Sequence, residues 1–180
     1  MKEGADIIVV ACNTATACTI DSLRNQLHIP IIGTEPNILT PRRMHFKNIA
    51  ILTTPLTAQS QRFNKLISAN CQPIICNNLA SDIEKSLTMK TDIKINDLID
   101  KIKSINADCI VLGCTHYTFI EKKLMALNLP IFDSIDGVCK QIRIITNSLP
   151  TGCGNIIIFT TTRNQKLQNS YIKYYKQLSL

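Results

Sequence analysis

Cys12 stands where an apolar run of the sequence meets a segment with helical spacing. The run 7–11 is rich in β-branched residues, and Asn13 and Thr14 follow the cysteine. Ligands bind at the carboxyl ends of strands in α/β sheets, so this junction delivers a thiol, an amide and a hydroxyl to a candidate cleft. The N-terminus of the following helix would add backbone N–H groups and a positive dipole end, which suit a carboxylate.

Cys114 repeats this arrangement later in the chain. It follows the apolar run 109–113 and precedes Thr115 and His116, and a second helical segment comes next. His116 is close enough to polarise the thiol or to bind a substrate carboxylate, because a neighbouring histidine changes the reactivity of cysteine. The chain therefore carries the same strand-to-helix junction twice.

The pairing of Cys12 with Cys114 suggests one kind of chemistry. A single cysteine is most often a small buried hydrophobe. Two thiols at equivalent junctions suit a reaction that removes a proton from one face of a carbon and returns one to the other face. One base alone would tend to give the proton back to the same face. The pair thus predicts racemisation, with both sulfurs facing one cleft and separated by no more than ~10 Å.

The other cysteines and histidines lack this setting. We expect them to be packing or surface residues; they are Cys18, Cys71, Cys76, Cys109, Cys139, Cys153, His28 and His45.

The elements that must position the two junctions alternate along the chain, which predicts an α/β fold with mainly parallel sheets. Short β-branched runs predict buried strands, at 6–11, 29–34, 48–53, 73–76, 108–112, 130–133 and 155–160. Apolar residues at spacings of three and four predict helices, at 15–27, 57–68, 79–87, 95–105, 119–127 and 137–149. The first strand is all apolar, as at the centre of a sheet, although only five residues precede it.

Composition excludes several classes of protein. The formal charge of +7 over 180 residues is dispersed, without a basic run or an aromatic platform, so we expect no nucleic-acid partner. No apolar stretch is long enough to span a membrane. The cysteines lack the paired spacing of a zinc site, and neither a leader nor small size calls for disulfides. A cytoplasmic protein with free thiols is the expectation.

The two junctions resemble the signatures of the glutamate racemases, in the aspartate/glutamate racemase superfamily. Residues 9–15 (VVACNTA) are similar to the first signature and residues 112–117 (LGCTHY) to the second. The second is specific, since aspartate racemases are expected to have Glu after the Cys-Thr pair. The segments 30–36 (PIIGTEP) and 51–60 (ILTTPLTAQS) also occur in the family's order.

The resemblance implies two pseudo-symmetric α/β lobes with the active site in the cleft between them, and no metal, pyridoxal phosphate or other cofactor. Residues 1–38 and 115–180 would form the first lobe, and residues 39–114 the second. The chain would interconvert L- and D-glutamate in the cytoplasm and supply D-glutamate for peptidoglycan. A homodimer is among the assemblies it allows.

The resemblance also implies roles for individual residues. Cys12 and Cys114 would be the acid/base pair, with His116 beside the second. The substrate would be held by Asn13, Thr14, Thr54, Thr57, Thr115 and His116.

Departures from the family pattern leave alternatives open. The Asp-Ser-Gly motif of the family's first strand and its Pro-Tyr-Gly loop do not occur in the chain, so we expect the first lobe to lack its N-terminal strand. Thr118 replaces a proline, and a family Glu falls on Ser81, with Glu84 just beyond it. An inactive truncated remnant and a related aspartate or hydantoin racemase are the alternatives.

Overall fold

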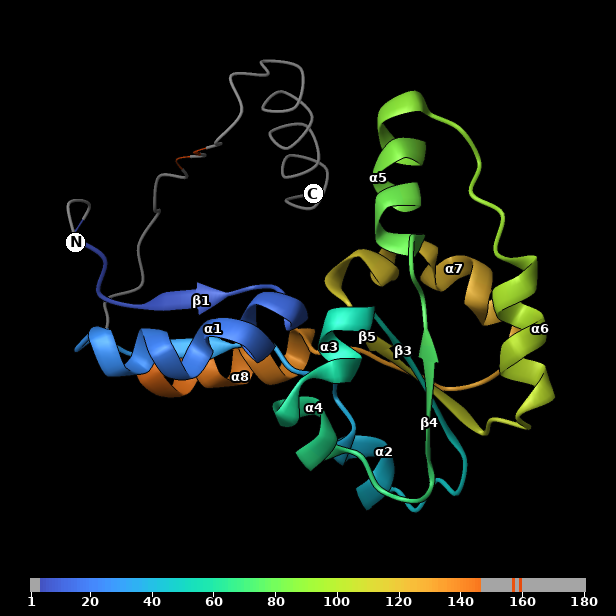
Figure 1. Ribbon diagram of the computed structural model, residues 1–180, viewed down its shortest axis with the longest axis horizontal. Helices are drawn as coiled ribbons and strands as arrows, with labels where there is room; N and C mark the ends of the chain where they lie inside the picture. Colours follow the sequence, from blue (N-terminus) through green and yellow to red (C-terminus); the bar gives the residue numbers. More distant parts are fainter. Residues whose placement is uncertain (1–3, 147–156, 158, 160–180) are drawn as a thin grey trace. The chain divides into compact units, whose positions relative to one another are not determined.

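The computed structural model describes residues 4–146 together with 157 and 159, and these contain two parallel sheets (Figure 1). The smaller sheet pairs β1 (Ile8–Val10) with β2 (Ile31–Gly33), in parallel. Helix α1 (Asn13–Gln26) connects the two strands and packs on both, and α8 (Ile135–Thr146) contacts β2. We call this pair the two-stranded sheet.

The larger sheet has the strand order β4-β3-β5-β6, and every pairing is parallel. We call it the four-stranded sheet; its members are β3 (Ile49–Thr53), β4 (Cys71–Ile75), β5 (Cys109–Gly113) and β6 (Ile131–Phe132). The predicted α/β class with parallel sheets is confirmed.

Helices occupy the crossings of the four-stranded sheet. They are α3 (Pro55–Gln59), α4 (Gln61–Leu66), α5 (Leu79–Met89), α6 (Asn96–Ser104), η1 (Thr115–Ile120), α7 (Glu121–Leu124) and η2 (Met125–Leu127). A further helix, α2 (Leu39–Arg43), precedes β3 on the way from the two-stranded sheet. No helix within the described residues is long and apolar enough to cross a bilayer.

The central strands β3 and β5 are buried on both faces. Along β3, Ala50 and Leu52 join one core with residues of α5, α6, η1 and α7, while Ile49 and Ile51 join a second core with Phe63 of α4. Successive side chains of a strand point to opposite faces, so a strand covered on both sides reads as a continuous apolar run. This double coverage explains why these strands could be recognised from composition.

The prediction of one continuous helix over 57–68 is wrong, because the structure has two short helices there. The chain is extended at Ser60 (φ −73°, ψ 142°), which ends α3 and begins α4. The Ser60 hydroxyl accepts a hydrogen bond from the Phe63 backbone N–H at 3.1 Å, so it caps the second helix. A capping serine can separate two short helices without changing the spacing of the apolar residues, so that spacing alone does not reveal the break.

Three other predicted elements differ from the structure. The helix predicted over 119–127 is a run of 3₁₀, α and 3₁₀ turns that begins at Thr115. The strand predicted at 73–76 lies over Cys71–Ile75. β1 is not fully buried, since Val9 is 37% exposed and the described residues pair with this strand on one side only. The strand predicted at 155–160 and the end of the helix predicted over 137–149 lie outside the described residues.

The lobe boundary predicted at residue 115 does not match the sheet pairing. β6 pairs with β5 in the four-stranded sheet, and Tyr117, Ile120 and Leu124 are buried in the same core as the strand before them. Residues 115–132 therefore belong with the four-stranded sheet, and the chain crosses back at Asp133 and Ser134, before α8. We propose that the chain divides into two lobes at Asp133 and Ser134 and not at residue 115.

Candidate active site

Cys12 is the N-cap of α1, two residues after the end of β1. Its sulfur is exposed and accepts a hydrogen bond from the Ala15 backbone N–H at 3.5 Å. An N–H donor at a helix N-terminus favours negative charge on the atom it faces. The location predicted for this thiol, at a strand-to-helix junction, agrees with the structure.

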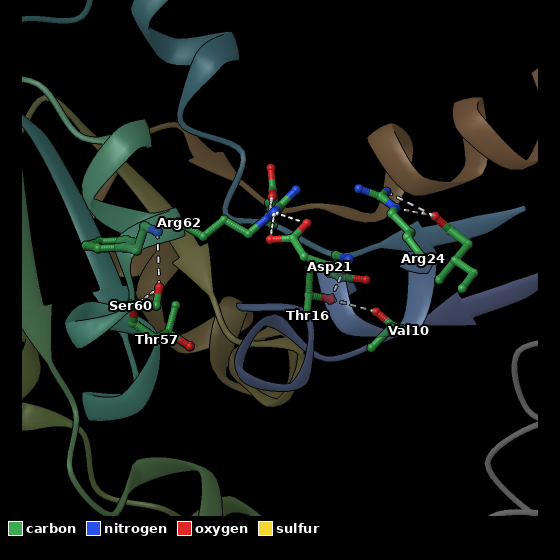
Figure 2. A network of polar contacts seen from close by, with 11 residues as sticks. Val10, Thr16, Asp21, Arg24, Thr57, Ser60 and Arg62 are labelled. Atoms are coloured by element: carbon green, nitrogen blue, oxygen red, sulfur yellow. Dashed lines mark hydrogen bonds and ion pairs between the residues drawn. The ribbon is translucent and has the colours of Figure 1, made fainter. Parts of the chain in front are cut away.

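Thr16 fixes the first turn of α1 against both strands of its sheet. Its hydroxyl donates to the Val10 carbonyl at 3.2 Å and accepts from the Thr34 backbone N–H at 2.9 Å. Figure 2 shows the Thr16 side chain beside Val10. A Cβ on Gly33 would lie 2.5 Å from the Thr16 methyl group, so only glycine lets the helix approach this closely.

Asn13 follows Cys12 and carries an unpaired amide. The residue is 3% exposed, and within the described residues neither Nδ2 nor Oδ1 has a hydrogen-bond partner. A buried polar group without a partner costs about 1–3 kcal/mol, so the amide is an unsatisfied donor and acceptor next to Cys12 in the sequence.

Three threonine hydroxyls meet beside this junction. Thr14 Oγ1 lies 2.9 Å from Thr54 Oγ1 and 3.0 Å from Thr57 Oγ1, and the latter two are 2.9 Å apart. Thr14 belongs to α1, whereas Thr54 caps α3 and Thr57 lies within it. We call these residues the hydroxyl cluster. It connects the helix of the two-stranded sheet to a helix of the four-stranded sheet.

Cys114 lies directly beyond β5 and is buried, with 9% of its surface exposed. Burial raises the pKa of its thiol, the nearby backbone N–H groups of His116 and Tyr117 lower it, and negative charge on Cys12 raises it further. The distance between the sulfurs of Cys12 and Cys114 stays a prediction.

The close fit around Cys114 depends on the residue before it. A Cβ on Gly113 would lie 2.6 Å from the Leu52 backbone carbonyl of β3. Only a residue without a side chain fits at this end of β5, so the sequence Gly-Cys has a steric reason.

His116 bridges Cys114 and an acidic residue that lies on α5. Its Nδ1 is 3.8 Å from Cys114 Sγ, and its Nε2 is 2.9 Å from Glu84 Oε1. Thr115, also predicted to hold substrate, is half-buried at the first position of η1. The structure thus brings together Cys114, His116 and Glu84 at one junction, and Thr14, Thr54 and Thr57 at the other.

Two groups were not assigned to the site from the sequence. Glu84 was noted only as a neighbour of Ser81, and nothing in its spacing indicated that it would reach His116. Arg62 pairs with Asp21 and Glu35, and no pattern in the sequence indicated these contacts. A charged residue within an amphipathic segment carries no signal of its own.

A hollow with a volume of about 690 Å³ lies beside α1 and α4 and contains neither Cys12 nor Cys114; its lining includes Cys18, Asp21, Glu35 and Arg62. The thiols of the two junctions therefore lie outside this hollow. Among the residues that the structure describes, no group of three or more His, Cys, Asp or Glu could hold a metal ion.

The family model and the similar proteins indicate the same family for this chain. The model of the Asp/Glu/hydantoin racemase family matches residues 1–142. A glutamate racemase of Clostridium kluyveri is 31% identical over 98% of this chain and 76% of its own length. A glutamate racemase of Clostridium botulinum is 37% identical over 76% of this chain and 56% of its own length. The chain thus spans between about half and three quarters of these relatives.

A solved structure shares the fold. The crystal structure of Escherichia coli glutamate racemase, in complex with L-glutamate and the activator UDP-MurNAc-Ala, superimposes with a TM-score of 0.78. The match covers 96% of this chain and 71% of that protein, at 19% sequence identity. The fold of this chain is therefore the two-lobe α/β fold of that structure.

Proposed function

Because this chain belongs to the Asp/Glu/hydantoin racemase family, we propose that it interconverts L- and D-glutamate with two cysteines and without a cofactor. Cys12 and Cys114 are the acid/base pair of this proposal. The substrate is held by Asn13 and by the hydroxyl cluster. The single observation that carries the proposal is the buried, unpaired amide of Asn13 next to Cys12.

The Asn13 amide has the donor and acceptor set that an α-amino acid requires. Nδ2 can donate to a carboxylate and Oδ1 can accept from an ammonium group, and both atoms are unpaired within the described residues. A zwitterion supplies both partners at once, so its binding removes the cost of the unpaired amide. The side chain lies next to Cys12 in the sequence, so a substrate bound to it is held beside the thiol.

The hydroxyl cluster supplies further donors for a carboxylate. Without a ligand, the hydroxyls of Thr14, Thr54 and Thr57 bond to one another at 2.9–3.0 Å. A carboxylate that enters the cluster accepts these hydrogen bonds in charge-assisted form, which is stronger than the neutral form. Because Thr57 is only 1% exposed, the bonds form away from competing water.

The proton transfers use the two cysteines in opposite protonation states. One sulfur, as a thiolate, takes the Cα proton, and the electron pair of the C–H bond delocalises into the substrate carboxylate. The other cysteine, as a thiol, gives its proton to the opposite face of the same carbon. At the end of one turnover the first cysteine is a thiol and the second a thiolate, which is the state required for the reverse reaction.

Burial favours Cys114 as the thiol of the resting protein. The raised pKa of Cys114 keeps its proton in place until substrate is bound. For the enantiomer that needs Cys114 as the base, His116 Nδ1, which faces this sulfur, accepts its proton, and the nearby backbone N–H of His116 favours the thiolate. Cys12, exposed at the N-terminus of α1, receives the Ala15 backbone N–H, which favours negative charge on its sulfur during turnover.

Circular dichroism of glutamate solutions tests the proposal. Purified protein without added cofactor should bring L-glutamate and D-glutamate to the same racemic end point. Aspartate and a hydantoin serve as comparison substrates. A racemisation rate that is higher with aspartate or the hydantoin would contradict the substrate assignment, and no turnover of any of the three would contradict the activity.

The proposal extends to the cellular role of the product. D-glutamate is a component of bacterial peptidoglycan, and a cytoplasmic enzyme that makes it supports growth of the cell wall. Depletion of the protein in its own bacterium should impair cell shape, and added D-glutamate should restore it. A normal cell wall after complete depletion would contradict this role.

A further inference from the structure

Arg62 joins the α4 helix of the four-stranded sheet to the α1 helix of the two-stranded sheet. Its Nη1 donates to both carboxylate oxygens of Asp21, at 3.0 and 3.1 Å, and its Nε donates to Glu35 Oε1. Figure 2 shows the Arg62 side chain extended from α4 toward Asp21. The hydrogen bond to Glu35 raises the pKa of Arg62, so the guanidinium is charged throughout the working pH range.

Glu35 lies where the two chain crossings between the sheets meet. The first crossing leaves β2 and includes Glu35; the second leaves β6 and includes Ser134. The Ser134 hydroxyl donates to the Glu35 backbone carbonyl at 2.6 Å. Arg62 therefore connects α4 not only to α1 but also to the point at which the crossings are tied together.

Asp21 and Thr14 attach the same face of α1 to the neighbouring segment 54–62. Seven residues separate them, close to two helical turns, so they lie on one side of the helix at a spacing of about 10 Å. Thr14 bonds to Thr54 and Thr57, and Asp21 pairs with Arg62. Because Thr16 and Arg24 tie α1 to its own sheet, these two attachment points together fix the direction of α1 and its sheet against segment 54–62, whereas the hydroxyl cluster alone would leave them free to pivot there.

We propose that Arg62 is a positioning residue, whose bonds to Asp21 and Glu35 set the direction of α1 and thereby hold Cys12 and Asn13 in place. Both residues lie at the N-terminus of α1, so a pivot about the hydroxyl cluster moves them relative to the junction at Cys114. The effect on catalysis rests on the function proposed above. The effect on α1 itself does not.

The Arg62 ion pairs are partly exposed, which makes them sensitive to salt. The Arg62 side chain is 29% exposed and the Asp21 side chain 77% exposed, and both line the open hollow beside α4. Isolated exposed pairs stabilise a fold by little, so we expect a local effect on α1 and not loss of the fold. Salt screens such pairs, so high salt should have the same local effect on α1 as removal of the Arg62 charge.

Substitution of Arg62 tests the proposal in the full chain. Arg62→Met keeps most of the aliphatic stem and removes the charge, and it should lower kcat/KM for glutamate by about tenfold, mostly through a higher KM. Arg62→Lys retains a charge and should recover most of the loss. Raising the salt from about 0.05 M to about 0.5 M should lower kcat/KM of the wild type but hardly that of Arg62→Met.

Lys123→Met is the matched control. Lys123 also pairs with an exposed carboxylate, Asp92, and its side chain is 35% exposed, but it lies on α7, away from α1. Its substitution should leave kcat/KM and the salt dependence unchanged. A loss equal to that of Arg62→Met would mean that any removed ion pair has this effect, and the proposal would be overturned.

Hydrogen exchange measured by mass spectrometry separates this proposal from the proposed function. Arg62→Met should speed exchange in α1, at residues 13–26, and leave β3, at residues 49–53, as in the wild type. Unchanged exchange in α1, or an equal rise in β3, overturns the proposal, as does faster α1 exchange with unchanged kcat/KM in an active enzyme. If the wild type shows no turnover, the proposed function fails and exchange alone decides whether Arg62 fixes α1.

Discussion

His116 and Glu84 meet across two separate elements, with His116 Nε2 2.9 Å from Glu84 Oε1. A carboxylate accepts hydrogen bonds, so in the neutral ring the contact holds the proton on Nε2 and leaves Nδ1 as an acceptor. That second nitrogen faces Cys114 Sγ at 3.8 Å. In the mechanism proposed above, Glu84 therefore sets the orientation in which His116 takes the proton of the Cys114 thiol.

Glu84→Gln should lower kcat by at least about tenfold, which corresponds to about 1.4 kcal/mol of barrier. The amide can donate as well as accept, so it no longer holds the His116 proton on Nε2. Steady-state kinetics in both directions measure the change. Asp82→Asn is the control, because Asp82 is also acidic and on α5 but pairs with Lys85. Equal effects of the two substitutions would contradict a specific role for Glu84.

Replacement of one thiol should separate the two halves of the reaction. Cys12→Ser and Cys114→Ser should each abolish racemisation, because a serine hydroxyl is far too weak an acid to replace a thiol. The remaining cysteine should still exchange the Cα proton of one enantiomer with solvent. Deuterium wash-in measured separately for L- and D-glutamate tests this. Full racemase activity in either variant would contradict the two-thiol mechanism.

Thr57→Val should raise KM for glutamate by about tenfold, with a smaller change in kcat. Valine keeps the shape of the buried side chain but removes one donor to the substrate carboxylate, and hydrogen bonds to charged groups contribute about 1.5–3 kcal/mol. Thr40→Val is the control, since the Thr40 hydroxyl lies on α2 and donates to Asn37 Oδ1, not to the hydroxyl cluster. A KM unchanged by Thr57→Val would remove the hydroxyl cluster from the substrate site.

The buried thiol of Cys109 should make stability fall at alkaline pH. Burial raises its pKa from the ordinary value of 9.0 to about 12. The folded state therefore keeps a proton that the unfolded chain loses first. This contribution to stability is complete below pH 9 and is lost as the pH rises toward 12.

Urea unfolding at a series of pH values between about 8 and 10.5 measures this loss. Cys109→Ala should reduce the decline in the free energy of unfolding over that range. Some decline should persist, because burial also raises the pKa of Cys76 and Cys114. A decline of the same slope in Cys109→Ala and wild type would mean that the Cys109 thiol contributes nothing to it.

The strands could be predicted because β3 and β5 are covered on both faces, which requires continuous apolar runs. The division of segment 57–68 into two helices could not, because Ser60 falls within the apolar period and caps a new helix without altering it. In the site, the locations of Cys12 and Cys114 followed from the strand-to-helix junctions. The contact of Glu84 with His116 depends on how α5 and η1 pack on one sheet, and local spacing does not encode it.

The most direct measurement of the two-base claim is the isotope content of glutamate during racemisation in D₂O. Starting from L-glutamate, early D-glutamate should carry deuterium at Cα while the remaining L-glutamate keeps protium, and the reverse should hold from D-glutamate. Each cysteine then protonates only one face of the carbon. Deuterium that enters the remaining substrate as fast as it enters the product would indicate a single base for both faces and would contradict the roles proposed for Cys12 and Cys114.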